Sequence, residues 1–259
     1  FLGETLDSIR SYTGNHPYEV IIINDGSTDQ NTLNLLDKLQ EKEYLILHQE
    51  NKGPAAARNT GVKSTKGEYI LFLDSDNKIK GEYIEKGVEI LKHHRDVGVV
   101  YGNLSLFGEK SGPVSLPDFD IYKLLSGNYI DMCTIVRKKV WEEIKGFDED
   151  RKVMGFEDWE FWIRAYEANW KFYHINEVMF EYRVRPNSLL KQAREEERYQ
   201  NVLNHVYSKH LNLFINNYKH LFKQYTYYRK DQEKPFRSFF KFFYKKYISK
   251  PTAKAPDQD

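Results

Sequence analysis

Two aspartates separated by one residue follow an apolar segment near the first third of the chain. Leu71-Phe72-Leu73 leads into Asp74-Ser75-Asp76. Because side chains alternate along an extended strand, Asp74 and Asp76 can face the same way. Two carboxylates at a strand end suit a divalent cation that bridges phosphate oxygens. A plain Asp-rich turn that includes Asn77 is the alternative interpretation of these residues.

Another carboxylate ends an earlier apolar segment. Val20-Ile21-Ile22-Ile23 is a β-branched run that is closed by the turn Asp25-Gly26-Ser27. In this position Asp25 can accept a hydrogen bond from the imide N–H of a uracil or thymine ring. A simple turn between a strand and a helix capped by Asp29 would also explain the pattern.

Two further segments place charged side chains near helix starts. Asn51-Lys52-Gly53-Pro54 opens a small-residue helix that carries Arg58, which can reach a base or a diphosphate. Glu157 and Asp158 follow Gly155 and open another helix, whose dipole favours their ionised forms. An ionised carboxylate that faces a pocket can take a proton from a sugar hydroxyl. A solvated arginine and ordinary acid enrichment at a helix start are the structural alternatives.

The elements that must position these residues alternate through the first half of the chain. The patterns predict strands at 19–24, 44–48, 68–73 and 97–101, and helices at 29–39, 53–64 and 82–93. Such alternation indicates a Rossmann-like α/β fold, a mostly parallel sheet flanked by helices, which binds ligands at the carboxyl ends of its strands. Residues 102–120, rich in Gly, Pro and Ser, are predicted to be loops. Because the chain opens on a helix, we expect a first strand to be missing from this sequence.

Length and composition predict one catalytic domain with an appendage. The 259 residues can bury a sizeable core, and we expect a catalytic domain at 1–186 and a helical extension, rich in aromatic and basic residues, at 187–259. The formal net charge of +1 gives no overall attraction to nucleic acid. The single cysteine, Cys133, and the lack of a signal peptide or long apolar run favour a cytoplasmic protein.

Taken together, the motifs resemble those of the family 2 glycosyltransferases of the GT-A fold, over about residues 1–190. That family carries an Asp-Gly-Ser turn, an Asn-x-Gly…Ala-Arg-Asn-x-Gly helix, an Asp-x-Asp (DXD) pair and a late Glu-Asp pair, and all four occur here in order. The resemblance implies an inverting, metal-dependent enzyme of polysaccharide or glycoconjugate synthesis. Such an enzyme would transfer a sugar from a nucleotide-sugar donor to a hydroxyl of a saccharide or lipid-linked acceptor. The pattern around Asp25 favours UDP or dTDP as the nucleotide.

The resemblance also implies roles for individual residues. Asp158 is expected to be the catalytic base, with Glu157 as the second candidate. Asp76 is expected to bind Mn²⁺ or Mg²⁺. The residues expected to bind the nucleotide sugar are Asp25, Ser27, Asn51, Gly53, Arg58, Asp74 and Arg183.

The sequence departs from the family pattern in several places. The family's first strand is absent, Asn77 stands where a third Asp is frequent, and Arg185 stands where many members carry His. The Gln-x-x-Arg-Trp signature of processive synthases is not found after Asp158, which favours transfer of a single sugar.

Two other classes of function stay open at this point. One is a nucleotide-sugar-binding module without catalytic activity. The other is a Mg²⁺-dependent phosphatase of the haloacid dehalogenase class with Asp74 as nucleophile, although Lys78 stands where that class has Thr or Val.

The C-terminal extension carries an apolar stripe at helical spacing, made of Phe236, Phe239, Phe240, Phe243 and Tyr247. Basic residues lie beside this stripe. We therefore expect residues 235–250 to form an amphipathic helix that docks peripherally on the inner face of the membrane. Packing of the stripe on the catalytic domain, or on a second subunit of a homo-oligomer, is the alternative.

Overall fold

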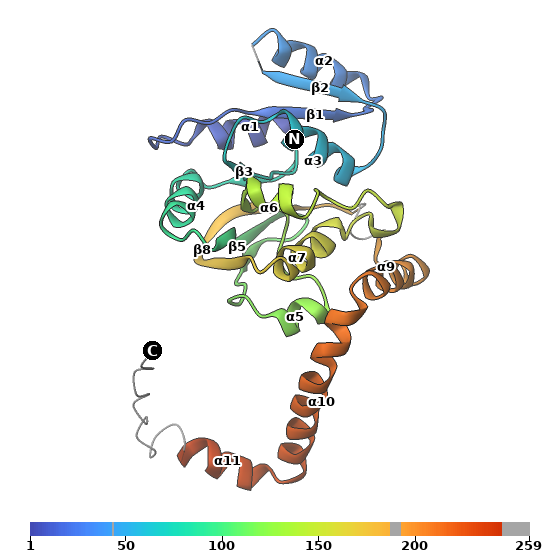
Figure 1. Ribbon diagram of the computed structural model, residues 1–259. Helices are drawn as coiled ribbons and strands as arrows, with labels where there is room; N and C mark the ends of the chain where they lie inside the picture. The colour runs from blue at the N-terminus through green and yellow to red at the C-terminus, as the bar shows by residue number, and fades with distance from the viewer. Residues whose placement is uncertain (43, 187–192, 245–259) are drawn as a thin grey trace. The chain divides into compact units, whose positions relative to one another are not determined.

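The computed structural model describes residues 1–42, 44–186 and 193–244 of the chain (Figure 1). The chain divides into two compact units, Phe1–Leu211 and Asn212–Asp259. Strands and helices make up the first unit, whereas the described part of the second unit is helical. The predicted α/β class with a helical C-terminal extension is thus confirmed.

The first unit contains most of the secondary structure. Its elements in chain order are α1 (Leu2–Arg10), β1 (Ile21–Asp25), α2 (Gln30–Gln40), β2 (Leu45–Gln49), α3 (Pro54–Ser64), β3 (Tyr69–Leu71), β4 (Lys78–Ile79), α4 (Glu82–His93), β5 (Val97–Gly108), β6 (Gly112–Val114), α5 (Ile121–Ser126), β7 (Ile135–Arg137), α6 (Lys138–Glu143), the 3₁₀ turn η1 (Arg151–Val153), α7 (Glu157–Glu167), β8 (Lys171–Val184) and α9 (Glu196–Lys209).

β1 and β2 form a small parallel sheet. The helix between them, α2, begins where predicted because the Asp29 carboxylate accepts a hydrogen bond from the Thr32 amide at 2.8 Å. α3 contacts β1 closely because it carries small residues. A side-chain carbon built at Gly61 would lie only 3.5 Å from Cγ1 of Ile23. The start of α3 is held at the end of β1 by the Lys52 and Gly53 amides, which donate to the Asp25 carboxylate at 2.9 and 2.8 Å.

The larger sheet has six strands in the order β3-β7-β5-β8-β4, with β6 paired to β5. β5 and β8 pair in parallel, whereas β3, β4, β6 and β7 pair antiparallel with their neighbours. The strand pairing is therefore mixed, rather than mostly parallel as predicted. Antiparallel pairing needs no helical crossover, so the short strands β4 and β7 can join this sheet from loops.

The prediction of loops at 102–120 is wrong in its first half. β5 continues to Gly108, and β6 returns beside it after a turn between Gly108 (φ 93°) and Gly112 (φ 126°). Gly102 does not break the strand. A side-chain carbon there would approach Cγ of Met179 on β8 to 2.3 Å, so the glycine permits close β5–β8 contact. Pairing with β8 along the whole strand outweighs the weak local propensity of these residues.

α7 is fixed by two fully buried tryptophans. Trp159 donates its indole N–H to the Leu124 carbonyl at 2.6 Å, and Trp162 donates to the Ile130 carbonyl at 3.1 Å. Both acceptors flank residues 125–129, which connect α5 to the segment before β7. These bonds hold the first turn of α7 close to that connection.

α9 belongs to the first compact unit, which ends at Leu211. His205 and Lys209 on α9 pair with Asp148 at 2.9 and 2.6 Å, and the buried His210 lies 3.3 Å from Glu160 of α7.

α10 (Leu211–Glu233) and α11 (Pro235–Phe243) follow and make up the described second unit. The predicted helix at 235–250 is confirmed as far as Phe243, and residues 245–250, including Tyr247, lie outside the described residues. None of the described helices is both long and apolar enough to cross a bilayer.

Candidate active site

Arg58 joins three of the four sequence motifs. Its guanidinium donates to Glu157 Oε1 at 2.6 Å and to Asp74 Oδ1 at 2.9 Å. The side chain is only 15% exposed, and its cation lies 5.8 Å from the ring centre of Phe147. Burial alone would lower the pKa of Arg58, but the two carboxylates raise it overall. Arg58 is therefore a fixed cation shared between the DXD segment and the first turn of α7.

Asp25 organises the loop between β2 and α3. Its Oδ1 accepts from the Gln49 side chain at 2.7 Å and from the Lys52 amide at 2.9 Å, and its Oδ2 accepts from the Gly53 amide at 2.8 Å. Gly53 has a φ of 90°, which favours glycine at this position. A carboxylate offers about four acceptor sites, so Asp25 keeps capacity for one further donor.

Ser27 and Asn51 lie beside this carboxylate and are exposed. The Ser27 amide donates to the Asn24 side chain at 2.9 Å. Gly26 has a φ of 72°, and a side-chain carbon there would lie 2.8 Å from the Asn51 amide nitrogen. The β1–α2 turn and the β2–α3 loop thus meet with no side chain between them.

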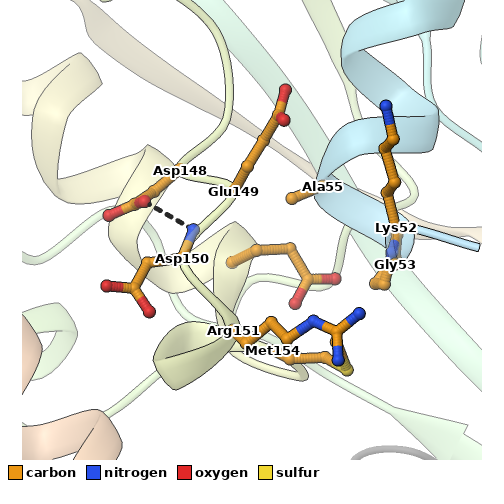
Figure 2. A pocket seen from close by; sticks show the side chains of 10 residues that line it. Lys52, Gly53, Ala55, Asp148, Glu149, Asp150, Arg151 and Met154 are labelled. Atoms are coloured by element: carbon orange, nitrogen blue, oxygen red, sulfur yellow. Dashed lines mark hydrogen bonds between the residues drawn. The ribbon is translucent and has the colours of Figure 1, made fainter.

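A small pocket adjoins the start of α3 (Figure 2). Gly53 and Ala55 line it on one side, and Asp148, Glu149, Asp150, Arg151 and Met154 line it from the segment before α7. Glu157 also lines it, so the pocket borders the Arg58 ion cluster. Two of the predicted site residues, Gly53 and Glu157, therefore line the same pocket.

Asp76 is paired with an arginine from the end of β8. Its Oδ2 lies 2.8 Å from Nε of Arg185, a side chain that is 45% exposed. Burial raises the pKa of Asp76 above its usual value, and the positive charge of Arg185 offsets part of this rise. The backbone carbonyl of Asp76 accepts from Nε of Arg183 at 3.0 Å.

Arg183 itself is enclosed by aromatic rings. Its guanidinium carbon lies 4.4 Å from the ring centre of Phe1 and 4.3 Å from that of Phe107. It also pairs with Glu4 at 3.0 Å and is 13% exposed. The structure thus engages Arg183 in packing and leaves Arg185 as the more exposed cation next to Asp76.

Glu157 and Asp158 have different partners although they are neighbours. Glu157 accepts from Arg58 and, through Oε2, from the Gly155 amide at 2.6 Å, and the residue is 5% exposed. Asp158 accepts from the Asn128 side-chain amide at 2.8 Å. Burial, then the charges of Glu157 and Asp131, raise the pKa of Asp158 well above its usual range. Asp158 is therefore the carboxylate of this pair that is suited to hold a proton.

Sequence reasoning missed three residues of this region: Asn128, Asp131 and Tyr182. Burial, followed by the charge of Asp74, raises the pKa of Asp131 to about 7. Burial and the charge of Asp131 raise the pKa of Tyr182 to about 12. An Asn and an Asp just before the buried strand β7 were the available signal, since polar residues at strand ends often face ligands.

The acids near Asp76 have the ligand chemistry of a divalent-cation site, although among the described residues they do not form a group of three converging ligand atoms. The side-chain groups of Asp74, Asp76 and Asp131 are oxygen ligands, as Mg²⁺ and Mn²⁺ prefer. Burial is the main cause of the raised pKa of Asp131, and the charges of Asp74 and Asp76 add to it, while Arg58 offsets it in part. A cation bound near Asp76 would compensate those negative charges.

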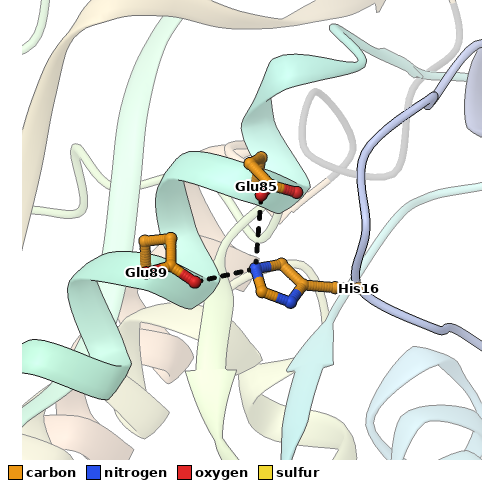
Figure 3. A group of neighbouring side chains, drawn as sticks. All are labelled: His16, Glu85 and Glu89. Carbon is orange, nitrogen blue, oxygen red and sulfur yellow. Dashed lines mark ion pairs between the residues drawn. The ribbon is translucent and has the colours of Figure 1, made fainter.

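A second group of potential metal ligands has another explanation. His16, Glu85 and Glu89 form the group of three found among the described residues (Figure 3). Nε2 of His16 lies 3.0 Å from Glu89 and 3.6 Å from Glu85. The Lys92 ammonium already lies 3.0 Å from Glu89 and 3.3 Å from Nδ1 of His16. We therefore interpret the group as an ion cluster that ties the loop after α1 to α4.

Known proteins with related sequences support the same class. The family model "Glycosyl transferase family 2" matches residues 1–164. TuaG of Bacillus subtilis, named as a teichuronic acid biosynthesis glycosyltransferase, is 28% identical over 73% of this chain and 76% of its own length. The glycosyltransferase GlyG of Streptococcus pneumoniae is 30% identical over 74% of this chain and 69% of its own length.

The fold agrees with a solved structure. The crystal structure of S. aureus TarS residues 1–349 in complex with UDP-GlcNAc superposes with a TM-score of 0.63 at 23% identity, over 78% of this chain and 60% of that chain. The fold is therefore that of the GT-A glycosyltransferases. The chain belongs to glycosyl transferase family 2, and its relatives include proteins of polysaccharide biosynthesis.

Proposed function

We propose that this protein transfers one sugar from a nucleotide-diphosphate sugar to an acceptor hydroxyl, with inversion at the anomeric carbon and with Asp158 as the general base. The observation that carries this proposal is the contrast between the two acids of α7. Glu157 is held by Arg58, whereas Asp158 faces further carboxylates and has a raised pKa. A carboxylate with a pKa moved toward neutrality suits proton transfer.

The proposed mechanism assigns a role to each of these side chains. Asp158 accepts the proton of the acceptor hydroxyl while that oxygen attacks the anomeric carbon from the face opposite the nucleotide. Asn128 orients the Asp158 carboxylate through its hydrogen bond. A positioned base contributes about 10²–10⁴-fold to such a reaction. Arg58 holds the Glu157 side chain in place, and the neighbouring charge of Glu157 helps to raise the pKa of Asp158.

The departing nucleoside diphosphate requires positive charge. Asp76, with Asp74 and Asp131 close by, would hold Mn²⁺ or Mg²⁺, and the ion would supply electrostatic stabilisation of the diphosphate. Arg185, released from Asp76, would remain beside the same phosphates.

We also propose the chemical class of donor and acceptor. Asp25 and the β2–α3 loop would receive a pyrimidine base, which favours a UDP or dTDP sugar. UDP-GlcNAc is present in the related TarS structure, which supports a donor of this class. The acceptor would be a saccharide or a lipid-linked saccharide at the inner face of the cytoplasmic membrane, and relatives named for teichuronic acid synthesis support this proposal.

A panel of nucleotide sugars tests the proposal directly. Each compound is titrated into the protein by calorimetry with Mn²⁺, and release of free nucleotide is then followed with a mixture of saccharide acceptors. Binding and acceptor-dependent nucleotide release with one or a few UDP or dTDP sugars are expected. Binding without transfer or hydrolysis would indicate a binding module instead, and release of inorganic phosphate from simple phosphate esters would indicate a phosphatase.

A further inference from the structure

α11 presents three phenylalanine side chains to solvent on one face. Phe236, Phe239 and Phe240 are 80%, 60% and 66% exposed. They stand at positions i, i+3 and i+4 of one helix and therefore share a face. We call these three side chains the phenylalanine face. Single exposed apolar residues are common on proteins, but contiguous large ones mark an interaction surface.

The surrounding segment concentrates positive charge. Residues 212–250 contain ten Lys and Arg and two Asp and Glu, whereas the formal net charge of the whole chain is only +1. The remainder of the chain is thus net acidic. Arg237, next to the phenylalanine face, and Lys234, just before α11, are both exposed. A segment of this composition is complementary to an anionic surface and would repel a second copy of itself.

The dimensions of α11 also limit its partner. Its nine residues correspond to about 13 Å of helix, far less than the roughly 30 Å of a bilayer core. Such a helix can lie in the plane of the headgroups with its aromatic face toward the acyl chains. Phe side chains and basic residues on one short helix are the composition that this position requires.

α10 provides a useful contrast within the same unit. Its exposed Ile215, Tyr218, Phe222 and Tyr225 follow one another at intervals of three, four and three residues, which is the spacing of a helix–helix seam. This seam covers fewer than the three or four heptads that a coiled coil normally needs. α11 has the same spacing at Phe236, Phe239 and Phe243, but it spans little more than one heptad and contains no acidic residue. Its basic and aromatic composition therefore fits an anionic lipid surface better than a second copy of the same helix.

We propose that the phenylalanine face of α11 inserts into the headgroup layer of an anionic bilayer, with Arg237 and the neighbouring basic residues on the lipid phosphates. This proposal rests on the proposed function in one respect only: membrane binding would bring the catalytic domain to a lipid-linked acceptor. Membrane binding itself requires neither donor nor acceptor.

Co-sedimentation of the full chain with vesicles tests the proposal. The vesicles are pure phosphatidylcholine or an equimolar mixture of phosphatidylcholine and phosphatidylglycerol, at low and high salt. Binding to the mixed vesicles is expected to be strong at low salt, at least about tenfold weaker at high salt, and weak with phosphatidylcholine alone. Equal binding to both vesicle types, or binding that ignores salt, would contradict the electrostatic part of the proposal.

Two triple variants distinguish lipid from protein partners. Changing Phe236, Phe239 and Phe240 to Ser is expected to weaken vesicle binding on the order of a hundredfold. The matched control changes Ile215, Tyr218 and Phe222 of α10 to Ser and should bind vesicles like the unchanged protein. Equal vesicle binding by the phenylalanine variant and the unchanged protein would overturn the proposal. So would a dimer, seen by analytical ultracentrifugation, that is lost only in the phenylalanine variant, since the face would then bind a second copy.

The vesicle assay also separates the two proposals. If the protein binds vesicles as expected but transfers no sugar, the membrane-binding proposal stands and the proposed function is wrong. If the protein transfers sugar to a soluble acceptor but does not bind vesicles, the proposed function stands and the membrane-binding proposal is wrong. Arg237→Glu sharpens the electrostatic part, because it should weaken binding to the mixed vesicles about tenfold and leave thermal unfolding of the first unit unchanged.

Discussion

The first turn of α7 places two acidic side chains, Asp158 and Glu160, in opposite electrostatic environments. Glu160 is fully buried, and Arg164, Lys209 and His210 surround its carboxylate at 2.6, 2.7 and 3.3 Å. Burial alone would raise the pKa of Glu160, but hydrogen bonds from His210 and Arg164 lower it to about 2. Asp158, two residues earlier, has an amide and a backbone N–H as partners, and burial raises its pKa.

This difference separates a structural carboxylate from a reactive one. Glu160 has a full set of cations, so it ties α7 to α9 and keeps its charge under all ordinary conditions. Asp158 lies among Glu157 and Asp131, and Arg58 is already shared by Glu157 and Asp74. Uncompensated negative charge in a partly buried region favours uptake of a proton or a metal ion. We therefore expect neutralising Asp158 to reduce catalysis and neutralising Glu160 to reduce stability.

The largest expected effect is that of Asp158→Asn on catalysis. The amide keeps the shape of the side chain but cannot accept a proton, so transfer should fall about 10²–10⁴-fold. Donor affinity should stay within a few-fold of the unchanged protein, because the proposed nucleotide site is at Asp25 and the β2–α3 loop. Initial rates and calorimetry with the donor measure the two quantities. Transfer within tenfold of normal would move the role of base to Glu157.

Glu160→Gln should act on stability instead. Removing one partner of a buried ion cluster costs about 3–5 kcal/mol, and here it leaves Arg164 and Lys209 without their shared carboxylate. Urea unfolding at neutral pH measures this loss. Glu167→Gln is the matched control, since Glu167 is 37% exposed and should contribute about 1 kcal/mol or less.

The pH dependence of stability gives a second test of the Glu160 cluster. The pKa of Glu160 is lowered in the folded protein to about 2, whereas an unperturbed Glu has a pKa of about 4.3. The stabilisation is thus complete above about pH 5 and is lost as pH falls toward about 2. The Gln variant should show a flatter acid limb, and an unchanged limb would contradict the assignment.

The sequence predicted the elements better than the contacts between them. α4 was predicted at 82–93, as observed, because apolar periodicity and acidic first-turn residues are local signals. The β5–β6 hairpin was missed because the second half of β5 depends on pairing with β8, which local composition does not reveal. Arg183 and Arg185 are two residues apart on the same strand and its extension, so the sequence could not tell which would be enclosed. Phe1 and Phe107 decide that question in the folded protein.

The residues of the candidate active site were likewise easier to predict than the contacts between them. Arg58, Asp74 and Glu157 were predicted separately, and the fold brings them into direct contact. Asp131 is an isolated acid in a loop, and nothing near it in the sequence indicates its neighbours. Its importance arises only when the Trp162 indole fixes the preceding residue, Ile130, beside α7.

Smaller effects are expected at Asp76, which would hold the metal ion, and at Asp25, which would bind the pyrimidine ring of the nucleotide. Asp76→Ala should make UDP binding insensitive to Mn²⁺, with a loss of about tenfold when metal is present. Asp25→Ala should weaken UDP binding equally with and without metal, because it also releases the amides of Lys52 and Gly53. Calorimetry with UDP compares the four conditions. The same response of both variants to Mn²⁺ would show that the two carboxylates do not have separate roles.

Asn128→Ala should have the smallest effect, and its pH dependence identifies the cause. Asn128 donates to the Asp158 carboxylate at 2.8 Å and so favours its ionised form. Without this donor the pKa of Asp158 should rise further, because the ionised form loses a hydrogen bond. The acid limb of the pH–rate profile should then move to higher pH, with slower transfer on that limb and near-normal transfer once Asp158 is ionised. Asn128→Asp should move the limb further in the same direction, because it adds a like charge. If Asn128 only supports the loop before β7, both variants will slow transfer by the same factor at every pH, and the hydrogen bond will have no part in tuning the base.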